Sequence, residues 1–96
     1  NMQRITNKQL ESLATWINEL TGSPLESYTR DENGFRSNIG NHHISYAYGG
    51  VCLHRIVNEG GGVTCPIIHG HTTKRELFNA MHAYINGLRD AKEKFQ

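Results

Sequence analysis

The hydrophobic positions of this chain follow one period at the two ends and another in the middle. Near the N-terminus, five apolar residues recur at the spacing of one helix face: Leu10, Leu13, Ala14, Ile17 and Leu20. Thr6 and Gln9 have the spacing of a capping box, which predicts where this helix begins. Gly22 suits a helix end and Pro24 cannot continue a helix, so we expect the helix to end near residue 21.

The middle of the chain carries the apolar runs and turn residues that are typical of short strands. The five expected strands are residues 25–30, 35–39, 43–48, 51–57 and 63–68. Asn33-Gly34 separates the first two strands, and Gly49-Gly50 separates the next two; both dipeptides favour tight hairpin turns. Pro66 has no backbone N–H to donate, which favours an edge position for the fifth strand. Because no helix interrupts this region, we expect antiparallel connections.

A second helix is predicted at the C-terminal end of the chain. Thr73 and Glu76 repeat the capping-box spacing, and an apolar face follows: Leu77, Met81, Tyr84, Ile85 and Leu88. The order is therefore α-β-β-β-(β)-α, an α+β fold in which an antiparallel meander sheet carries both helices on one face. We expect residues 1–96 to form a single domain, with Asn1 as the remnant of an expression tag.

The composition predicts a small hydrophobic core. Hydrophobic residues make up 36% of 96 residues, and a homodimer interface would add buried area, so we expect a homodimer. The formal net charge of +1 does not favour wrapping around a polyanion, which requires many neutralised phosphates. No apolar run approaches the length of a membrane span, so we expect no membrane association. The expected location is cytoplasmic, because two cysteines without a disulfide framework suit a reducing compartment.

The cysteines, Cys52 and Cys65, form no CxxC motif and are too few for a disulfide framework. If residues 58–62 form a hairpin turn that pairs Val57 with Val63, Cys65 lies near Arg55 rather than opposite Cys52. This register does not force a disulfide, and we expect reduced thiols.

A candidate site for an anionic partner lies at the start of the second helix. Five consecutive residues place backbone N–H groups, hydroxyls and cations together: His71, Thr72, Thr73, Lys74 and Arg75. The glycine-rich turn is a second candidate anion cradle, which flanks the first if the last strand folds back beside it: Asn58, Gly60, Gly61 and Gly62. The alternatives are a helix start satisfied by its own capping box and a flexible hairpin turn.

The six histidines are the remaining candidates for chemistry. His42-His43 and His69-Gly70-His71 form close pairs in the sequence, and imidazole is a common metal ligand. No HExxH or cysteine-rich pattern accompanies them, so we expect no metal and no cofactor, with a small histidine-based metal protein as an alternative. No nucleophile is arranged with a base either, so we do not expect an enzyme.

The order helix, three strands, helix resembles the double-stranded-RNA-binding domain, whose second helix opens with basic residues that touch phosphates. Thr73-Lys74-Arg75-Glu76 falls at the corresponding place. Leu77 and Phe78 stand where that family has further basic character. This resemblance implies a nucleic-acid-binding module as an alternative function.

Several stretches across most of the chain resemble small orphan proteins of tailed bacteriophages and enterobacterial prophages. They include Asn38-Ile39-Gly40-Asn41-His42-His43, Ala47-Tyr48-Gly49-Gly50, Val57-Asn58-Glu59-Gly60-Gly61-Gly62-Val63 and Thr73-Lys74-Arg75-Glu76-Leu77. That group has no assigned activity, so the resemblance implies a setting in a bacterial host cell and no catalytic residues. We therefore expect a non-enzymatic accessory protein that binds a host factor, a nucleotide or another anionic partner.

Overall fold

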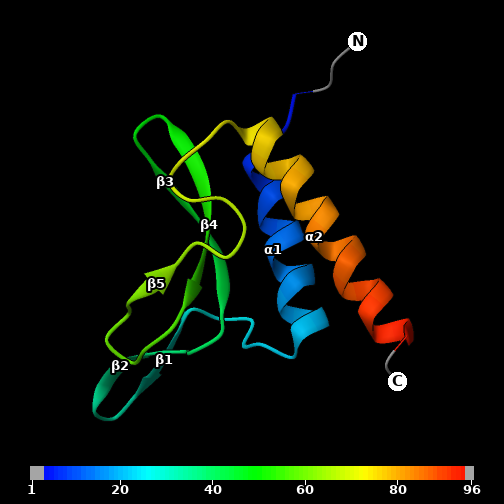
Figure 1. Cartoon of the computed structure of the whole chain (residues 1–96). Coiled ribbons are helices and arrows are strands. Elements are labelled where there is room, and N and C mark those ends of the chain that lie inside the picture. Colours follow the sequence, from blue (N-terminus) through cyan, green and yellow to red (C-terminus); the bar gives the residue numbers. More distant parts are fainter. Residues whose placement is uncertain (1–3, 95–96) are drawn as a thin grey trace.

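The computed structural model describes residues 4–94, so the expectation about Asn1 lies outside the described residues. The elements in chain order are α1 (Asn7–Thr21), β1 (Tyr28–Asp31), β2 (Gly34–Ser37), β3 (His42–Ala47), β4 (Gly50–Ile56), β5 (Val63–Thr64) and α2 (Lys74–Lys94). Both helices lie on the same side of the sheet formed by β3, β4 and β5 (Figure 1). The α+β class and the helix-first, helix-last order are confirmed.

The helix ends follow the signals in the sequence. Thr6 caps α1 with a complete capping box: its hydroxyl accepts from the Gln9 N–H at 3.2 Å, and the Gln9 side chain accepts from the Thr6 N–H at 2.8 Å. Gly22 ends α1 in the left-handed conformation with φ of 68°. At the start of α2, the Thr73 hydroxyl accepts from the Glu76 N–H at 3.1 Å. These bonds satisfy backbone donors that a helix leaves open at its start.

The core lies between the two helices and the inner face of the sheet. Its fully buried members come from α1, β4 and α2 and include Leu10, Ile17, Val51, Leu53, Leu77, Met81 and Ile85. Because side chains alternate across a strand, Val51 and Leu53 face the helices while Cys52 and His54 take the opposite face of β4. This alternation creates the outer face on which the candidate site is built.

The strands form two sheets, where the sequence pattern predicted one meander. β1 pairs only with β2, and β4 lies between β3 and β5. The break falls at Gly40, whose φ of 97° suits glycine, and at Asn41. The Asn41 side chain donates to the Pro24 carbonyl oxygen at 2.9 Å and accepts from the Ser27 hydroxyl at 2.9 Å. These contacts hold the chain before β3 against the segment before β1, so β2 does not continue into the larger sheet.

The fifth strand pairs in a different register from the predicted one. Val63 lies opposite Ile56 and Thr64 opposite Arg55, so the predicted pairing of Val57 with Val63 is wrong by one residue. The reason lies in the turn: Val57 N–H donates to the Gly62 carbonyl oxygen, and the Asn58 side chain accepts from the Gly62 N–H at 2.9 Å. This shift changes which side chains can meet across the strands.

Within residues 4–94, no helix has both the length and the apolar character needed to cross a membrane.

Candidate metal centre

Four side chains from neighbouring strands share the outer face of the sheet. On β4 these are Cys52 and His54, two residues apart; the register places Ser45 opposite Cys52 and His43 opposite His54. Both pairs belong to the same hairpin. Its turn is two residues long, and Tyr48 and Gly49 both have positive φ values, of 54° and 72°, as a type I′ turn requires. The hairpin therefore fixes how these four side chains lie relative to one another.

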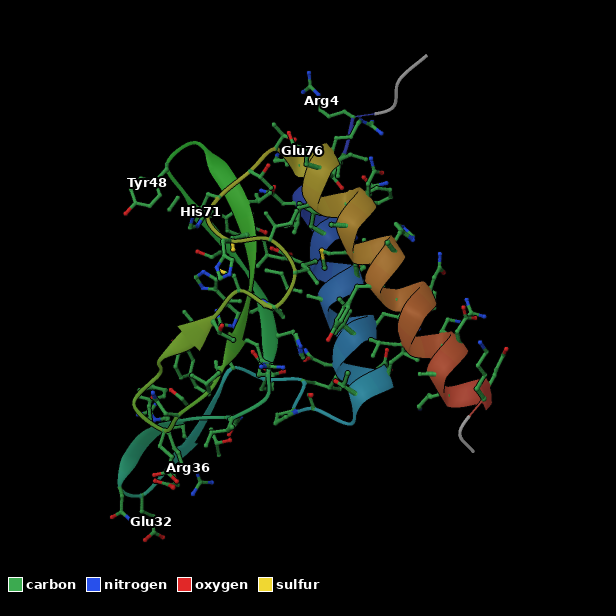
Figure 2. The ribbon with its side chains drawn as sticks, viewed as in Figure 1. Arg4, Glu32, Arg36, Tyr48, His71 and Glu76 are labelled. Atoms are coloured by element: carbon green, nitrogen blue, oxygen red, sulfur yellow. The ribbon has the colours of Figure 1, made fainter. Side chains whose placement is uncertain are left out.

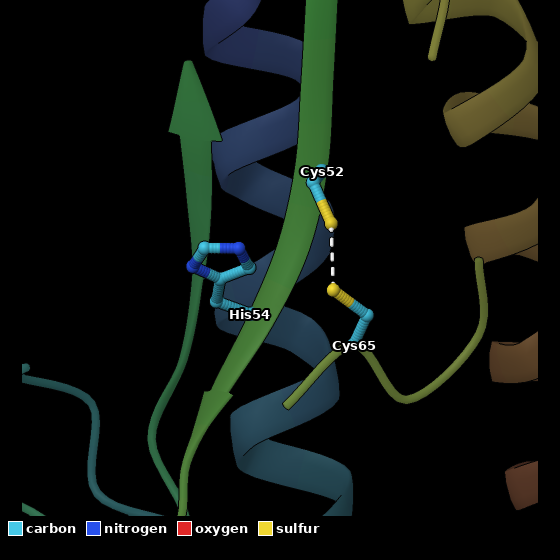
Figure 3. Close-up of side chains that lie close together, drawn as sticks. All are labelled: Cys52, His54 and Cys65. Carbon is cyan, nitrogen blue, oxygen red and sulfur yellow. Dashed lines mark hydrogen bonds between the residues drawn. The ribbon is translucent and has the colours of Figure 1, made fainter. Parts of the chain in front are cut away.

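Cys65 reaches the same face from the residue after β5. Its sulfur lies 3.2 Å from the Cys52 sulfur, and both cysteines are free thiols (Figure 3). The possible ligand atoms of Cys52, His54 and Cys65 all lie within 4.8 Å of one another. Cys52 is buried, while His54 and Cys65 are partly exposed. The expectation that Cys65 lies near Arg55 and away from Cys52 is therefore wrong, because the one-residue register shift brings its side chain to Cys52.

His71 enters the cluster from the segment that leads into α2. Its ring lies 6.0 Å from the His54 ring, centroid to centroid, and its Nε2 lies 3.1 Å from the Ser45 hydroxyl oxygen. The Tyr48 ring also lies near His71, at 5.5 Å between the ring centroids; Tyr48 belongs to the β3–β4 turn and His71 lies beside that hairpin (Figure 2). The His43 ring lies 5.7 Å from His54. The three imidazoles thus form a row of ring contacts centred on His54, which is the one grouped with the two thiols.

A backbone bridge holds the His71 segment against β4. Val51 N–H donates to the Thr72 carbonyl oxygen at 2.8 Å, and Thr72 N–H donates to the Val51 carbonyl oxygen at 2.9 Å. A Cβ atom at Gly50 would lie 2.8 Å from the Thr72 carbonyl oxygen, so only glycine allows this close approach. The bridge fixes the position from which the His71 side chain reaches the outer face.

The local electrostatics favour the neutral imidazoles of His43 and His54 and the protonated thiol of Cys52. Burial, and then the neighbouring charge of His71, lowers the pKa of His54. Burial, and then His54, lowers the pKa of His43. Burial raises the pKa of Cys52 to about 12, with further contributions from the hydrogen bond and charge of Cys65. Neutral imidazole has the free lone pair that a metal needs, whereas a thiol must lose its proton to become a ligand.

Two sulfurs and an imidazole nitrogen form a soft donor set. Such sets suit Zn²⁺ and related transition metals rather than Mg²⁺ or Ca²⁺, which prefer oxygen ligands. With Zn–S bonds of about 2.3 Å, tetrahedral geometry separates two sulfur ligands by roughly 3.8 Å. The Cys52 and Cys65 sulfurs, 3.2 Å apart, would need to separate by about half an ångström, which rotation about the Cα–Cβ bonds supplies. A water molecule would take the fourth position.

The predicted anion-binding residues lie in two separate places. His71, Thr72, Thr73, Lys74 and Arg75 lead into α2, whereas Asn58, Gly60, Gly61 and Gly62 form the turn between β4 and β5. Thr72 bonds to Val51 at the first end of β4, and the turn follows Ile56 at the other end. Five residues of strand, roughly 17 Å at about 3.4 Å per residue, separate them. The structure does not bring the two groups together.

In each of the two segments, some of the polar groups that could bind an anion already form hydrogen bonds within the protein. The Thr72 hydroxyl donates to the Glu76 carboxylate at 2.7 Å, and Thr72 N–H is committed to β4. In the glycine-rich turn, the Asn58 side chain holds Gly62, and Gly61 approaches Ser37 of β2. Lys74 is exposed and lines a shallow hollow with Gly49 and Gly50. Binding of an anionic partner at the start of α2 stays a prediction.

The histidine pairs of the sequence do not act as pairs in the fold. His42 points to the inner face, where it is buried against Asn18 of α1, while His43 takes the outer face. His69 is exposed, and His71 turns toward Ser45. The sequence analysis missed Cys52, His54 and Cys65 as a group. The Cys52-Leu53-His54 spacing on a strand is a usable signal for two of them, but Cys65 requires the correct register.

Comparison of the chain with protein-family models, with curated proteins and with solved structures found no match. The function is therefore inferred from the geometry of the site.

Proposed function

We propose that this protein is a non-enzymatic, metal-stabilised domain that binds one zinc-type transition-metal ion through Cys52, His54 and Cys65. The observation that carries the proposal is the convergence of two thiols and an imidazole, whose ligand atoms all lie within 4.8 Å of one another. These residues come from β4 and from the segment after β5, thirteen positions apart at the cysteines. Cysteine and histidine ligands gathered from separate segments are typical of protein zinc sites.

The position of the site supports a structural role for the metal. Residues 65–71 cross from β5 to the start of α2 without regular helix or strand, and β5 itself pairs only two residues with β4. A domain of this size gains proportionately little from its core, and a bound metal adds folding free energy outright. A metal held by Cys52, His54 and Cys65 would fasten this segment to the centre of the sheet.

Metal binding is tested on protein purified without a polyhistidine tag. Elemental analysis should return close to one zinc per chain, and titration with Co²⁺ should produce cobalt–thiolate charge-transfer absorption that excess Zn²⁺ removes. His54→Ala and Cys65→Ser should lose the signal. His69→Ala is the matched control, because this exposed histidine lies in the same segment. Absence of metal and of cobalt absorption, or equal binding by all three variants, contradicts the proposal.

For the biological setting, we propose an accessory protein of a phage or prophage that acts in the bacterial cytoplasm, as the sequence resemblance implies. Aromatic side chains on the β1–β2 hairpin are exposed, which supports the binding of a partner protein or a second copy of the chain over them. Tyr28 is 60% exposed and Phe35 73% exposed. Light scattering at high concentration should return twice the mass of the 10.8 kDa chain; a monomer mass contradicts the homodimer.

A further inference from the structure

We propose that Cys52 and Cys65 form a disulfide when a hydroperoxide oxidises them, and that this reaction empties the metal site. The inference deepens the proposed function and rests on it, because a metal must be bound before oxidation can release it. The two sulfurs would either bind the metal or form the disulfide, and each state excludes the other. The site would then report the oxidation state of its surroundings through metal occupancy.

The distance between the two sulfurs is intermediate between that of a zinc-bound pair and that of a disulfide. The separation of 3.2 Å is shorter than the roughly 3.8 Å expected across a tetrahedral zinc and longer than the about 2.05 Å of a disulfide bond. Forming the disulfide requires an approach of about 1.2 Å. Cys65 follows a two-residue strand and belongs to a segment without regular structure, so it can make this small movement more easily than Cys52 in β4.

The burial of the two cysteines sets the order of the reaction. Cys65 is partly exposed, whereas Cys52 is 1% exposed, so a peroxide in solution reaches the Cys65 sulfur first. The Cys65 sulfur attacks one peroxide oxygen; the O–O bond breaks, an alcohol or water leaves, and Cys65 becomes a sulfenic acid. The Cys52 sulfur then attacks the Cys65 sulfur, the S–O bond breaks and a second water leaves.

The reaction balances without any further reactant. Two thiols and one hydroperoxide give one disulfide, one alcohol and one water, and two electrons pass from the sulfurs to the peroxide. When the thiolates hold Zn²⁺, two protons from solvent complete the two leaving hydroxyl groups. The disulfide removes both thiolate ligands at once and leaves His54 as the sole member of the three-residue set. One imidazole is not enough to retain the ion.

The experiment follows metal and thiols in the same sample. Zinc-loaded protein is treated with one to a few equivalents of hydrogen peroxide, while a chromogenic chelator records released Zn²⁺. Thiol titration and the mass of the intact chain record the cysteines. The expected result is loss of both thiols, a mass lower by two hydrogen atoms than that of the reduced chain, and release of one Zn²⁺ in parallel; a dithiol reductant should restore binding.

The other outcomes separate the two proposals. If the reduced protein binds no metal before oxidation, the proposed function fails and this inference fails with it. If metal binds but peroxide gives stable sulfinic acid, intermolecular dimers or a disulfide that keeps its zinc, the metal site stands and the inference is overturned.

The variants isolate each step. His54→Ala keeps both thiols and removes a metal ligand, so it should still form the internal disulfide with no metal to release. Cys52→Ser should stop at the Cys65 sulfenic acid, which a sulfenic-acid-trapping dione would label. His69→Ala, as a control, should release zinc as the parent does. Failure of His54→Ala to form the disulfide under conditions that keep it folded overturns the inference as well.

Discussion

Tyr48 is the residue whose backbone conformation departs furthest from its own preference. It has φ of 54° in the β3–β4 turn and is 95% exposed, so burial does not compensate for the left-handed conformation. This conformation costs an ordinary L-residue roughly 1–2 kcal/mol, and asparagine tolerates it better. The Tyr48 ring contact with His71 offsets part of that cost.

Tyr48→Asn should therefore raise the free energy of unfolding by about 0.5 kcal/mol, as measured by urea denaturation. Tyr48→Val should lower it by about 1 kcal/mol or more, because a β-branched side chain fits this conformation worst. If asparagine destabilises the protein as much as valine does, the ring contact with His71 outweighs the backbone strain.

His42 is a buried histidine whose protonation is opposed by its surroundings. The Asn18 side-chain oxygen accepts from both the His42 backbone N–H and the His42 Nδ1–H, at 2.7 Å and 2.9 Å, which leaves Nε2 as the unprotonated nitrogen. Among residues 4–94, this buried Nε2 has no hydrogen-bond partner. Burial, and then the charges of Arg55 and His43, lowers the pKa of His42 from 6.5 to about 4. A proton on Nε2 would place an uncompensated charge in the interior.

The free energy of unfolding should decrease as the pH is lowered from 6.5 to about 4. In this range His42 binds a proton in the unfolded chain but stays neutral in the folded chain. The loss from this residue should reach at most about 3 kcal/mol at the low end and vanish above pH 7. The measurement is the difference in unfolding free energy between the parent and His42→Gln across this window. Carboxylates titrate in both proteins, so parallel profiles would show that His42 contributes nothing.

At the scale of elements, the contact between β4 and the segment before α2 depends on Gly50. A Cβ there would meet the Thr72 backbone, which is held in place by two hydrogen bonds. Gly87 is the matched glycine within a helix, and its added Cβ would meet nothing within 4 Å. The same substitution should therefore have opposite effects at the two positions.

Gly50→Ala should lower the free energy of unfolding by about 1–3 kcal/mol, because backbone atoms must move to admit the methyl group. Gly87→Ala should raise it by up to about 1 kcal/mol, because alanine restricts the unfolded chain and favours the helix. Chemical denaturation of both variants gives the comparison. If Gly50→Ala leaves the free energy of unfolding unchanged, the Val51–Thr72 bridge is not held tightly.

At the scale of the whole molecule, a metal that binds only the folded chain should raise the free energy of unfolding with the logarithm of the free metal concentration. Zn²⁺ at one hundred times its dissociation constant should add about 2.7 kcal/mol, seen as a higher melting temperature that a chelator reverses. Binding should also release about two protons, because both thiols must ionise. Cys65→Ser should melt at the same temperature with and without Zn²⁺. A similar shift in that variant would place the stabilising metal elsewhere.

The fold was largely predictable because its signals are local. Thr6, Thr73 and Gly22 lie at the predicted helix ends. Both predicted hairpins form, but each turn lies one residue earlier than the dipeptide that predicted it, at Glu32-Asn33 and at Tyr48-Gly49. Capping and turn preferences depend on residues within about four positions of each other, so the sequence contains the whole interaction. Predicted strand limits were less accurate, since strands end where their partners end.

Local signals along the chain specify the two amphipathic helices, the two hairpins and the two-residue spacing of Cys52 and His54. Contacts formed in the folded chain set the pairing of Val63 in β5 with Ile56 and divide the strands into two sheets between β2 and β3. A shift of one residue in register moves every side chain of a strand to the other face. It is this shift, set by hydrogen bonds within the 58–62 turn, that brings the Cys65 sulfur to Cys52. Helix and turn signals are short-range and readable along the chain, whereas register is settled by packing between residues that the sequence keeps apart.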